Sequence, residues 1–542
     1  MSVEEIIQLQ KLLEDNDATF RRTWQDTADL IFPRESNITE QLNSGDNEKY
    51  TKIYDPTAVI ESERMASGLL TNLVPAGQKF FSLTTSDTEV QELDAVKSYM
   101  ARATEILHEE LFSSNFLLQL AETLRSLIVF GTGSIYVEWK QGLNFMDWDI
   151  SRFQILENFQ GQVDTIVLKF PKTAKQAYQR WGDKAGESII EAVNDEKKAI
   201  KHFWFIHIVR PRQWRNPRFQ DNMNMAFESK YINVKDKSLI DEGGFPEFPY
   251  MIPRWAKTTG EVHGRGIGTM ILPQVRVLQR MKRDFIEVGN KFANPHREVL
   301  QSFEGDYDTT PGAHNEVSEI PSSYVDQNNF GNFPITKDIL EMQQKMIVDV
   351  FYGDAFAPIT STGTGDRRNE LEIEQRVAEA FRKIGSPIGR IESELFTPKI
   401  TRCFMLLVRN GVIPPPPEEL RGSPLKIMYK GPLSLAQQDA EVRASMRWVG
   451  AVGEMAQNPE FADVTDNVNS DKTVRRWGRV MGVNEDDIAK EEERDAKRAA
   501  RQAAIEKQQA LEAAQVAAGA YGQTTKAPEP GSAAEQLQEV AG

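Results

Sequence analysis

GRGIGTMILPQVRVLQRMKRDFIEVGNKFAN, residues 264–294, is the stretch of sequence that decides the fold. Its glycine-rich start ends at Pro273, a residue suited to the first turn of a helix. Apolar residues then recur on one side as far as about Asn294, at Val277, Met281, Phe285, Val288 and Phe292. About 20 residues of helix make a rod roughly 30 Å long. The stretch therefore predicts a long amphipathic helix.

A polar excursion follows this helix and leads to a second one. Residues 295–334 are rich in Asn, Asp, Gly and Pro, whereas residues 335–353 are again helical in pattern. An unstructured stretch of roughly 40 residues is unusual inside a compact domain. We therefore expect two rods that form a stem, with the excursion as a small separate module at its tip.

The two expected rods carry opposite net charge. The first has Arg276, Arg280, Lys282, Arg283 and Lys291 against Asp284 and Glu287. The second has Asp338, Glu341 and Asp349 against Lys337 and Lys345. This pattern favours rods that pair or that pack in a ring, and solvated faces with random charge are the alternative.

The first 263 residues alternate between helical and strand patterns, which predicts an α+β body. Helices are expected at residues 4–16, 20–32, 96–112 and 116–130, and in a segment beginning near Pro56. Strands are expected at residues 134–139, 153–156, 163–170, 203–209, 230–234 and 249–255. A short helix is expected between Thr173, a residue typical of an N-cap, and Gly182, typical of a helix stop.

The remaining residues are mainly helical in pattern, so the expected fold class is α+β and mainly helical. A small-residue loop, AFAPITSTGTGD at residues 355–366, precedes a helix from Asn369 that continues through Pro387 to Asn410. A polyproline hinge follows at residues 414–417. Further helices are expected at residues 434–457, with Ser434 as N-cap, and at 472–481 and 488–518. Residues 519–542 have the composition of a flexible tail.

Composition excludes several classes of protein. The chain is 40% hydrophobic and 9% aromatic, enough for real cores. Its longest apolar runs are far shorter than the roughly 20 residues of a membrane-spanning helix, and its acidic N-terminus does not resemble an export signal. The single cysteine, Cys403, lies in the apolar run CFMLLV and is expected in the core. The net charge of −16 argues against a protein that grips nucleic acid by neutralising phosphates.

No catalytic, metal or cofactor motif stands out. The glycine clusters at residues 131–133 and 363–365 lack the lysine of a phosphate loop and are expected to be turns. His202 and His207 are five apart in an expected strand, so they point to opposite faces and cannot share a metal. HExxH and GxSxG motifs do not occur. Pairs among the 80 carboxylates are expected by chance alone. We therefore predict no catalytic residues, no metal and no cofactor.

The order of these parts resembles the head-to-tail connector, or portal, proteins of short-tailed phages (podovirus type). Five strings carry the resemblance: SERMASGLLTNLVPAG with KFFSL (residues 62–83), LRSLIVFGTGSIYV (124–137), residues 173–182, residues 264–278, and residues 369–407 with NELEIEQRVAEAF and ELFTPKITRCFMLL. It covers nearly the whole chain, but after about residue 485 only the Ala/Gln-rich composition matches.

The resemblance implies a portal-type fold: a wing (1–263), a first stem helix (264–294), a clip (295–334), a second stem helix (335–353), a channel loop (354–368), a long helix and wing return (369–433), a helical crown (434–518) and a flexible tail (519–542). It implies a homo-dodecamer at the portal vertex of the virion, made in the host cytoplasm, with double-stranded DNA in its channel. Implied partners are the major capsid protein, the packaging ATPase (terminase), tail adaptor proteins and internal core proteins, with no membrane and no enzyme activity.

Three sets of residues are expected to perform these roles. Ring packing in the stem is assigned to Phe285, Val288, Met346 and Val350. Contact with DNA in the channel loop is assigned to Thr360, Ser361, Thr362, Gly363, Thr364, Arg367 and Arg368. Partner docking on the clip is assigned to Asp306, Asp308, Glu316 and Glu319, an acidic face that suits a basic partner. Two alternatives stay open: another virion structural protein, such as an internal core or tail-tube component, and a capsid-associated nuclease or peptidase.

Overall fold

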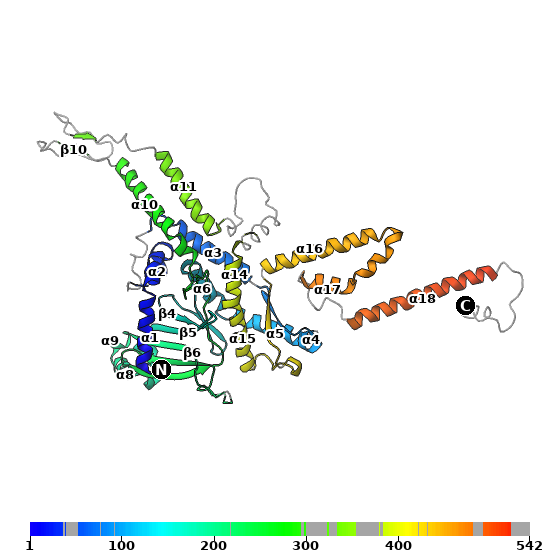
Figure 1. Ribbon diagram of the computed structural model, residues 1–542, viewed down its shortest axis with the longest axis horizontal. Helices are drawn as coiled ribbons and strands as arrows, with labels where there is room; N and C mark the ends of the chain where they lie inside the picture. The colour runs from blue at the N-terminus through cyan, green and yellow to red at the C-terminus, as the bar shows by residue number, and fades with distance from the viewer. Residues whose placement is uncertain are drawn as a thin grey trace. The chain divides into compact units, whose positions relative to one another are not determined.

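The computed structural model divides the chain into two compact units, Met1–Ser434 and Leu435–Gly542 (Figure 1). The structure describes residues 1–35, 38–39, 53–75, 77–91, 93–216, 218–219, 221–293, 297–299, 322–324, 333–353, 379, 383–420, 422–430, 432–480 and 491–521. Within these residues the protein is a mixed α/β structure in which helices predominate.

The first unit begins with five helices that the sequence predicts: α1 (Val3–Asn16), α2 (Ala18–Ile31), α3 (Thr57–Leu73), α5 (Asp94–Ser113) and α6 (Phe116–Phe130). The short α4 (Thr88–Gln91), which the sequence did not predict, lies before α5. Ser2 caps α1 in a reciprocal hydrogen-bonded box with Glu5. Helix α6, which has a broad apolar stripe, ends at Gly131, whose φ of 97° closes the helix as a left-handed cap.

Two antiparallel sheets follow. The larger has the order β4-β5-β6-β7-β8 and the smaller the order β3-β2-β9. Their strands are β2 (Ile135–Trp139), β3 (Leu143–Asp147), β4 (Phe153–Glu157), β5 (Val163–Thr173), β6 (His202–Pro211), β7 (Phe227–Asn233), β8 (Ser238–Phe245) and β9 (Tyr250–Met251). Strands β3 and β8 were not predicted from the sequence, and the strand expected at residues 249–255 is only the two residues of β9.

Short helices connect β5 to β6. They are α7 (Ala174–Trp181), α8 (Glu187–Val193) and α9 (Glu196–Ala199). Thr173 caps α7 with its side chain and Gly182 ends it, as predicted. Helix α1 lies on the larger sheet, where Ile6 and Leu13 form a small core with Val167, Ile206, Ile208 and Ile232.

The chain returns to its N-terminal part near the end of the first unit. After α14 (Gly385–Arg390), the π-helix η5 (Ile391–Phe396) and α15 (Thr397–Arg409), strand β12 (Leu425–Tyr429) pairs with β1 (Phe81–Thr85). Helix α15 contributes Ile400, Cys403 and Leu407 to the main core, each fully buried, which confirms the prediction for the cysteine.

The long helix at residues 264–294 is confirmed as α10 (Ile267–Ala293), and its partner is α11 (Phe333–Val350). The position of Pro273 was predicted wrongly, because it lies inside α10 and not in its first turn. The helix begins earlier because Gly266 and Gly268, which lack a Cβ, let its first turn approach the last carbonyls of α6.

The second unit is helical. It contains α16 (Pro432–Met455, which begins at the end of the first unit), α17 (Ser470–Val480) and α18 (Glu491–Tyr521). Ser434 is not the N-cap of α16 but lies inside it, because the helix already begins at Pro432, a residue favoured in a first turn. Asp471 on α17 pairs with Arg494 and Arg498 on α18 at 3.2 and 2.5 Å. Residues 522–542, which include most of the expected tail, lie outside the described residues.

Candidate functional site: the helical hairpin and its base

Helices α10 and α11 lie side by side and form a hairpin (Figure 1). Near their far ends, Arg297–Val299 (β10) pairs antiparallel with Ser322–Tyr324 (β11). The two helices share the main core of the unit through buried apolar residues such as Leu278 on α10 and Ile347 on α11, both with no exposed surface. The hairpin is therefore joined to the body by hydrophobic packing at its base.

A buried aspartate also joins the two helices at this base. The Gln279 side chain of α10 accepts hydrogen bonds from the backbone N–H groups of Tyr54 and Asp55 at 2.7 and 2.9 Å, and donates to the Asp55 carbonyl at 2.7 Å. Gln344 of α11 donates to the Asp55 carboxylate at 2.7 Å. Satisfied buried polar networks of this kind fix one geometry, so the segment before α3 sets how the hairpin is held.

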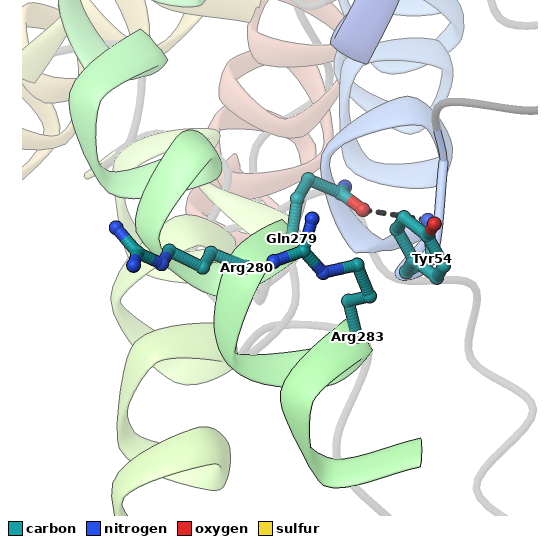
Figure 2. Close-up of a pocket in the computed structure, with 4 residues that line it drawn as sticks. All are labelled: Tyr54, Gln279, Arg280 and Arg283. Carbon is teal, nitrogen blue, oxygen red and sulfur yellow. Dashed lines mark hydrogen bonds between the residues drawn. The ribbon is translucent and has the colours of Figure 1, made fainter. Parts of the chain in front are cut away.

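An open pocket of about 340 Å³ lies beside this network and is lined by Tyr54, Gln279, Arg280 and Arg283. Figure 2 shows Arg283 reaching back toward Gln279, whereas Arg280 extends away from it. Arg283 forms ion pairs within its own helix, with Asp284 at 3.4 Å and Glu287 at 3.5 Å. The pocket is cationic, and the described residues that line it include no carboxylate.

A stripe of exposed apolar side chains runs along α11. Ile339, Met342, Met346 and Val350 retain 38%, 56%, 40% and 36% of their surface. Their spacing of three or four residues places them on one face of the helix. On α10, Met270 and Val277 are also about half exposed. Unpaired apolar stripes of this kind are typical of surfaces that another molecule covers.

The four residues predicted for ring packing do not share one environment. Met346 and Val350 lie on the exposed stripe of α11. Phe285 and Val288 of α10 are only partly exposed, and Phe285 packs against the core of its own unit. The hydrophobic period identified an apolar face on each helix, but part of the α10 face is occupied within the subunit.

The hairpin's charges are not paired across its two helices. In the described part of the chain, the ion pairs of α10 and α11 run within one helix, as in Lys337–Glu341 at 3.6 Å, or to α2, as in Arg276–Asp26 at 2.5 Å. Arg280 on α10, and Asp338 and Asp349 on α11, are exposed and take part in none of these ion pairs, so their charges are available to another molecule.

A glycine contact holds the start of α10 against the end of α6. A Cβ added at Gly266 would lie 2.6 Å from the backbone nitrogen of Gly131 and from the carbonyl oxygen of Ile128. Thr132 accepts a hydrogen bond from the backbone N–H of Gly264 at 2.9 Å. The cluster at residues 131–133 is thus a helix stop and a packing contact, consistent with the predicted turn.

Arg254 is the most extensively bonded side chain near this contact, and no sequence pattern pointed to it. It is almost fully buried and pairs with Glu394 of η5 at 2.7 Å and with Glu157 of β4. Burial alone would lower the pKa of Arg254, but its hydrogen bonds to these two glutamates raise the pKa above the ordinary value. The ion-pair network joins three distant segments of the chain.

The buried titratable groups have structural environments. His207 is stacked on Tyr231 with ring centroids 3.9 Å apart, and its two ring nitrogens bond the hydroxyls of Tyr250 and Ser229 at 2.8 and 2.9 Å. Burial lowers the pKa of His207 to about 3, so the ring is neutral at physiological pH. His202 is exposed at the start of the same strand, as the opposite-face prediction requires.

Metal-binding clusters and membrane-spanning helices are absent from the described residues. Among the described residues no cluster of three or more His, Cys, Asp or Glu could hold a metal ion. Within those same residues no helix has the length and apolar character to cross a membrane.

The other two predicted sets lie outside the described residues. They are the channel-loop set Thr360, Ser361, Thr362, Gly363, Thr364, Arg367 and Arg368, and the clip set Asp306, Asp308, Glu316 and Glu319. Both sets remain predictions.

The sequence is similar to known proteins over most of its length. Residues 3–488 match the family described as "Bacteriophage head to tail connecting protein". The chain is 25% identical to the probable portal protein of Bordetella phage BPP-1, over 91% of each chain. It is also 25% identical to the portal protein of Salmonella phage epsilon15, over 93% of this chain and 92% of the relative. A weaker similarity, 22% over 37% of this chain and 39% of the relative, relates it to the portal protein of Pseudomonas phage phiKMV.

Proposed function

Because the chain belongs to the bacteriophage head to tail connecting protein family, we propose that it assembles as a ring of twelve copies at one vertex of the capsid. A connector of this kind is a structural component of the virion and not an enzyme. In the proposed ring, double-stranded DNA enters the head through the central channel during packaging and leaves through it during ejection.

The hairpin is the observation that carries this proposal. It presents an exposed apolar stripe on α11, a basic face on α10 and an acidic face on α11. Since neither charged face is neutralised across the two helices, each can pair with the opposite face of a neighbouring copy. We assign the hairpin to the stem (264–294 and 335–353), with Met346, Val350 and Val288 at the contact and Phe285 beneath it. The wing (1–263), the wing return (369–433) and the crown (434–518) complete the ring.

The charge of the chain suits a channel through which DNA must slide. Twelve copies would carry roughly 12 × 16 excess negative charges, which repel phosphate over a Debye length of about 10 Å. The loop 354–368 would then touch the duplex through its hydroxyls and through Arg367 and Arg368. The sequence has no phosphate loop, so the energy for DNA movement comes from a separate packaging ATPase, the terminase.

The clip (295–334) is proposed as the docking module, first for the terminase and then for tail adaptor proteins. Its four acidic residues would meet a basic partner surface. A combined Asp306→Asn, Asp308→Asn, Glu316→Gln and Glu319→Gln variant should still form rings, because rim charges mainly tune association rate and salt sensitivity. It should bind the terminase more weakly, with a flatter salt dependence. Normal binding at every salt concentration would exclude the acidic face as the docking surface.

An infection experiment tests the function itself. A phage whose gene for this chain carries an early stop codon should produce heads that contain no DNA, and supplying the chain from a plasmid should restore filling. DNA that survives nuclease treatment of the purified heads is the readout. Filled heads in the absence of the chain would contradict the proposal and favour the alternative, another virion structural protein such as an internal core or tail-tube component.

A further inference from the structure

The connection between β6 and β7 has a composition that differs from the rest of the chain. The end of β6 and the first part of this connection, RPRQWRNPRFQ at residues 210–220, contain four arginines and no lysine, aspartate or glutamate. The whole chain, by contrast, has a net charge of −16. We call residues 212–226 the arginine–tryptophan loop. Neither the proposed stem nor the clip includes it.

Hydrogen bonds within the arginine–tryptophan loop hold its backbone in place. Arg212 donates to the carbonyl of Gly243 at 2.8 Å. The side chain of Asn224 accepts from the backbone N–H of Asn216 at 3.0 Å and donates to Asp221 at 2.5 Å. These bonds tie Arg212 to β8 and join Asn216 to the segment at Asp221 and Asn224, on either side of the exposed side chains.

Two of the four arginines form contacts within the subunit, and the other two form no ion pair with a described carboxylate. Arg210 pairs with Glu228, and Arg212 bonds backbone carbonyls. Arg215 and Arg218 are exposed, and in the part of the chain that the structure describes no carboxylate forms an ion pair with either. Two positive charges are thus free to meet another molecule.

Large aromatic side chains stand beside these two charges. Trp214 is 90% exposed and Phe219 is 60% exposed. Phe159, in the turn between β4 and β5, is 96% exposed. Ile166 of β5 pairs with Val209 of β6 in an antiparallel register, so this turn and the arginine–tryptophan loop leave the sheet at the same end. A fully exposed indole makes no contribution to the stability of the subunit, whereas Trp and Arg are the residues that most often dominate protein–protein binding energy.

We propose that this end of the sheet is a docking surface for a second virion protein, whose own surface is acidic around an apolar socket that takes the Trp214 indole. The net negative charge of the chain as a whole disfavours a phosphate backbone. Double-stranded DNA also offers no free base face on which an indole could stack. Arginine without lysine, combined with exposed aromatic residues, is instead the composition of the core of a protein interface.

This proposal rests on the proposed function in one respect, because it expects the partner to be a protein of the virion. Trp214 is replaced by the photo-crosslinking residue p-benzoyl-phenylalanine in the full chain, which complements an infection by phage lacking the gene. Presence of the chain in purified particles tests the proposed function by itself. Irradiation of these particles should then join position 214 to one other protein, at an acidic segment identified by mass spectrometry. The control places p-benzoyl-phenylalanine at Ile200, which is 70% exposed near the opposite end of β6. This variant should not give the cross-linked product.

A variant with both free charges removed completes the test. Arg215→Ser with Arg218→Ser, in the chain labelled at position 214, should reduce the cross-linked product by roughly ten-fold, about 1.4 kcal/mol in affinity. Its melting temperature should not change, because both side chains are exposed. Cross-linking to DNA, to a second copy of this chain or to no molecule would overturn the proposal, as would a yield that does not depend on the arginines.

Discussion

Replacing Met346 by aspartate tests the proposed contact between stems most sharply. In the single chain Met346 lies on the apolar stripe of α11 with 40% of its surface exposed. Full burial of a methionine side chain contributes roughly 1.5–3 kcal/mol, so covering the exposed two-fifths contributes about 1 kcal/mol. An aspartate at this position lacks the contribution from apolar burial. Desolvating its unpaired carboxylate in the contact costs on the order of several kcal/mol more. Because every subunit of a closed ring makes the contact on both sides, the penalty recurs around the ring.

Sedimentation velocity is the assay. We expect Met346→Asp to sediment as a monomer at concentrations at which the unchanged protein sediments as a ring. The monomer should stay folded, with a change in unfolding free energy within about 0.5 kcal/mol, as is usual for surface positions. Met346→Leu, which keeps volume and apolar character, should still form the ring. An intact ring from Met346→Asp would refute the placement of this stripe between subunits.

Three further predictions concern the fold that supports the hairpin. Gly266→Ala should lower the melting temperature, since its Cβ would lie 2.6 Å from two backbone atoms. The control is Gly289→Ala, at a position of α10 with open space around it. This variant should raise the free energy of unfolding by roughly 0.5–1 kcal/mol. Arg254→Met should lower the free energy of unfolding in urea by about 3–5 kcal/mol, because Glu394 and Glu157 lose their buried partner. An unchanged midpoint of urea unfolding would refute a structural role for the network. Burial lowers the pKa of Lys399 well below the ordinary value. Between the lowered pKa and the ordinary lysine pKa, the unfolded state therefore binds one proton more than the folded state. The free energy of unfolding should rise with pH across this range, by at most about 1.4 kcal/mol per pH unit. Lys399→Met should lose that slope.

Much of the secondary structure was predictable because local signals agreed with the tertiary structure. Helix α6 was predicted at its observed bounds, since a broad apolar stripe ends at a glycine. Strand β8 was missed because Gly243 and Gly244 interrupt the strand pattern of its sequence. Its residues have low β propensity, and the strand is stabilised by its pairing with β7. Pro273 was misplaced because a backbone contact with α6, invisible in the local sequence, sets where α10 begins.

The functional surfaces were predictable only in part. Periodicity showed that Phe285 and Met346 both lie on apolar faces, but it could not show that the first packs against its own subunit and the second is exposed. The Arg254 network joins residues up to 237 positions apart, from Glu157 to Glu394, and no local pattern signals such a contact. Trp214 stands in a loop whose arginines could have drawn attention to it, although its exposure depends on the sheet.

Electron micrographs of the purified full-length protein test the central claim most directly. We expect rings with a central hole that is wide enough for a DNA duplex, and two-dimensional class averages in which a stem formed by α10 and α11 surrounds that hole. Twelve-fold symmetry is expected for rings assembled in the capsid, and the same images of rings extracted from particles would measure it. A protein that remains monomeric at all concentrations, or that forms solid discs or filaments without a channel, would contradict the assignment of this chain as a ring-shaped DNA passage.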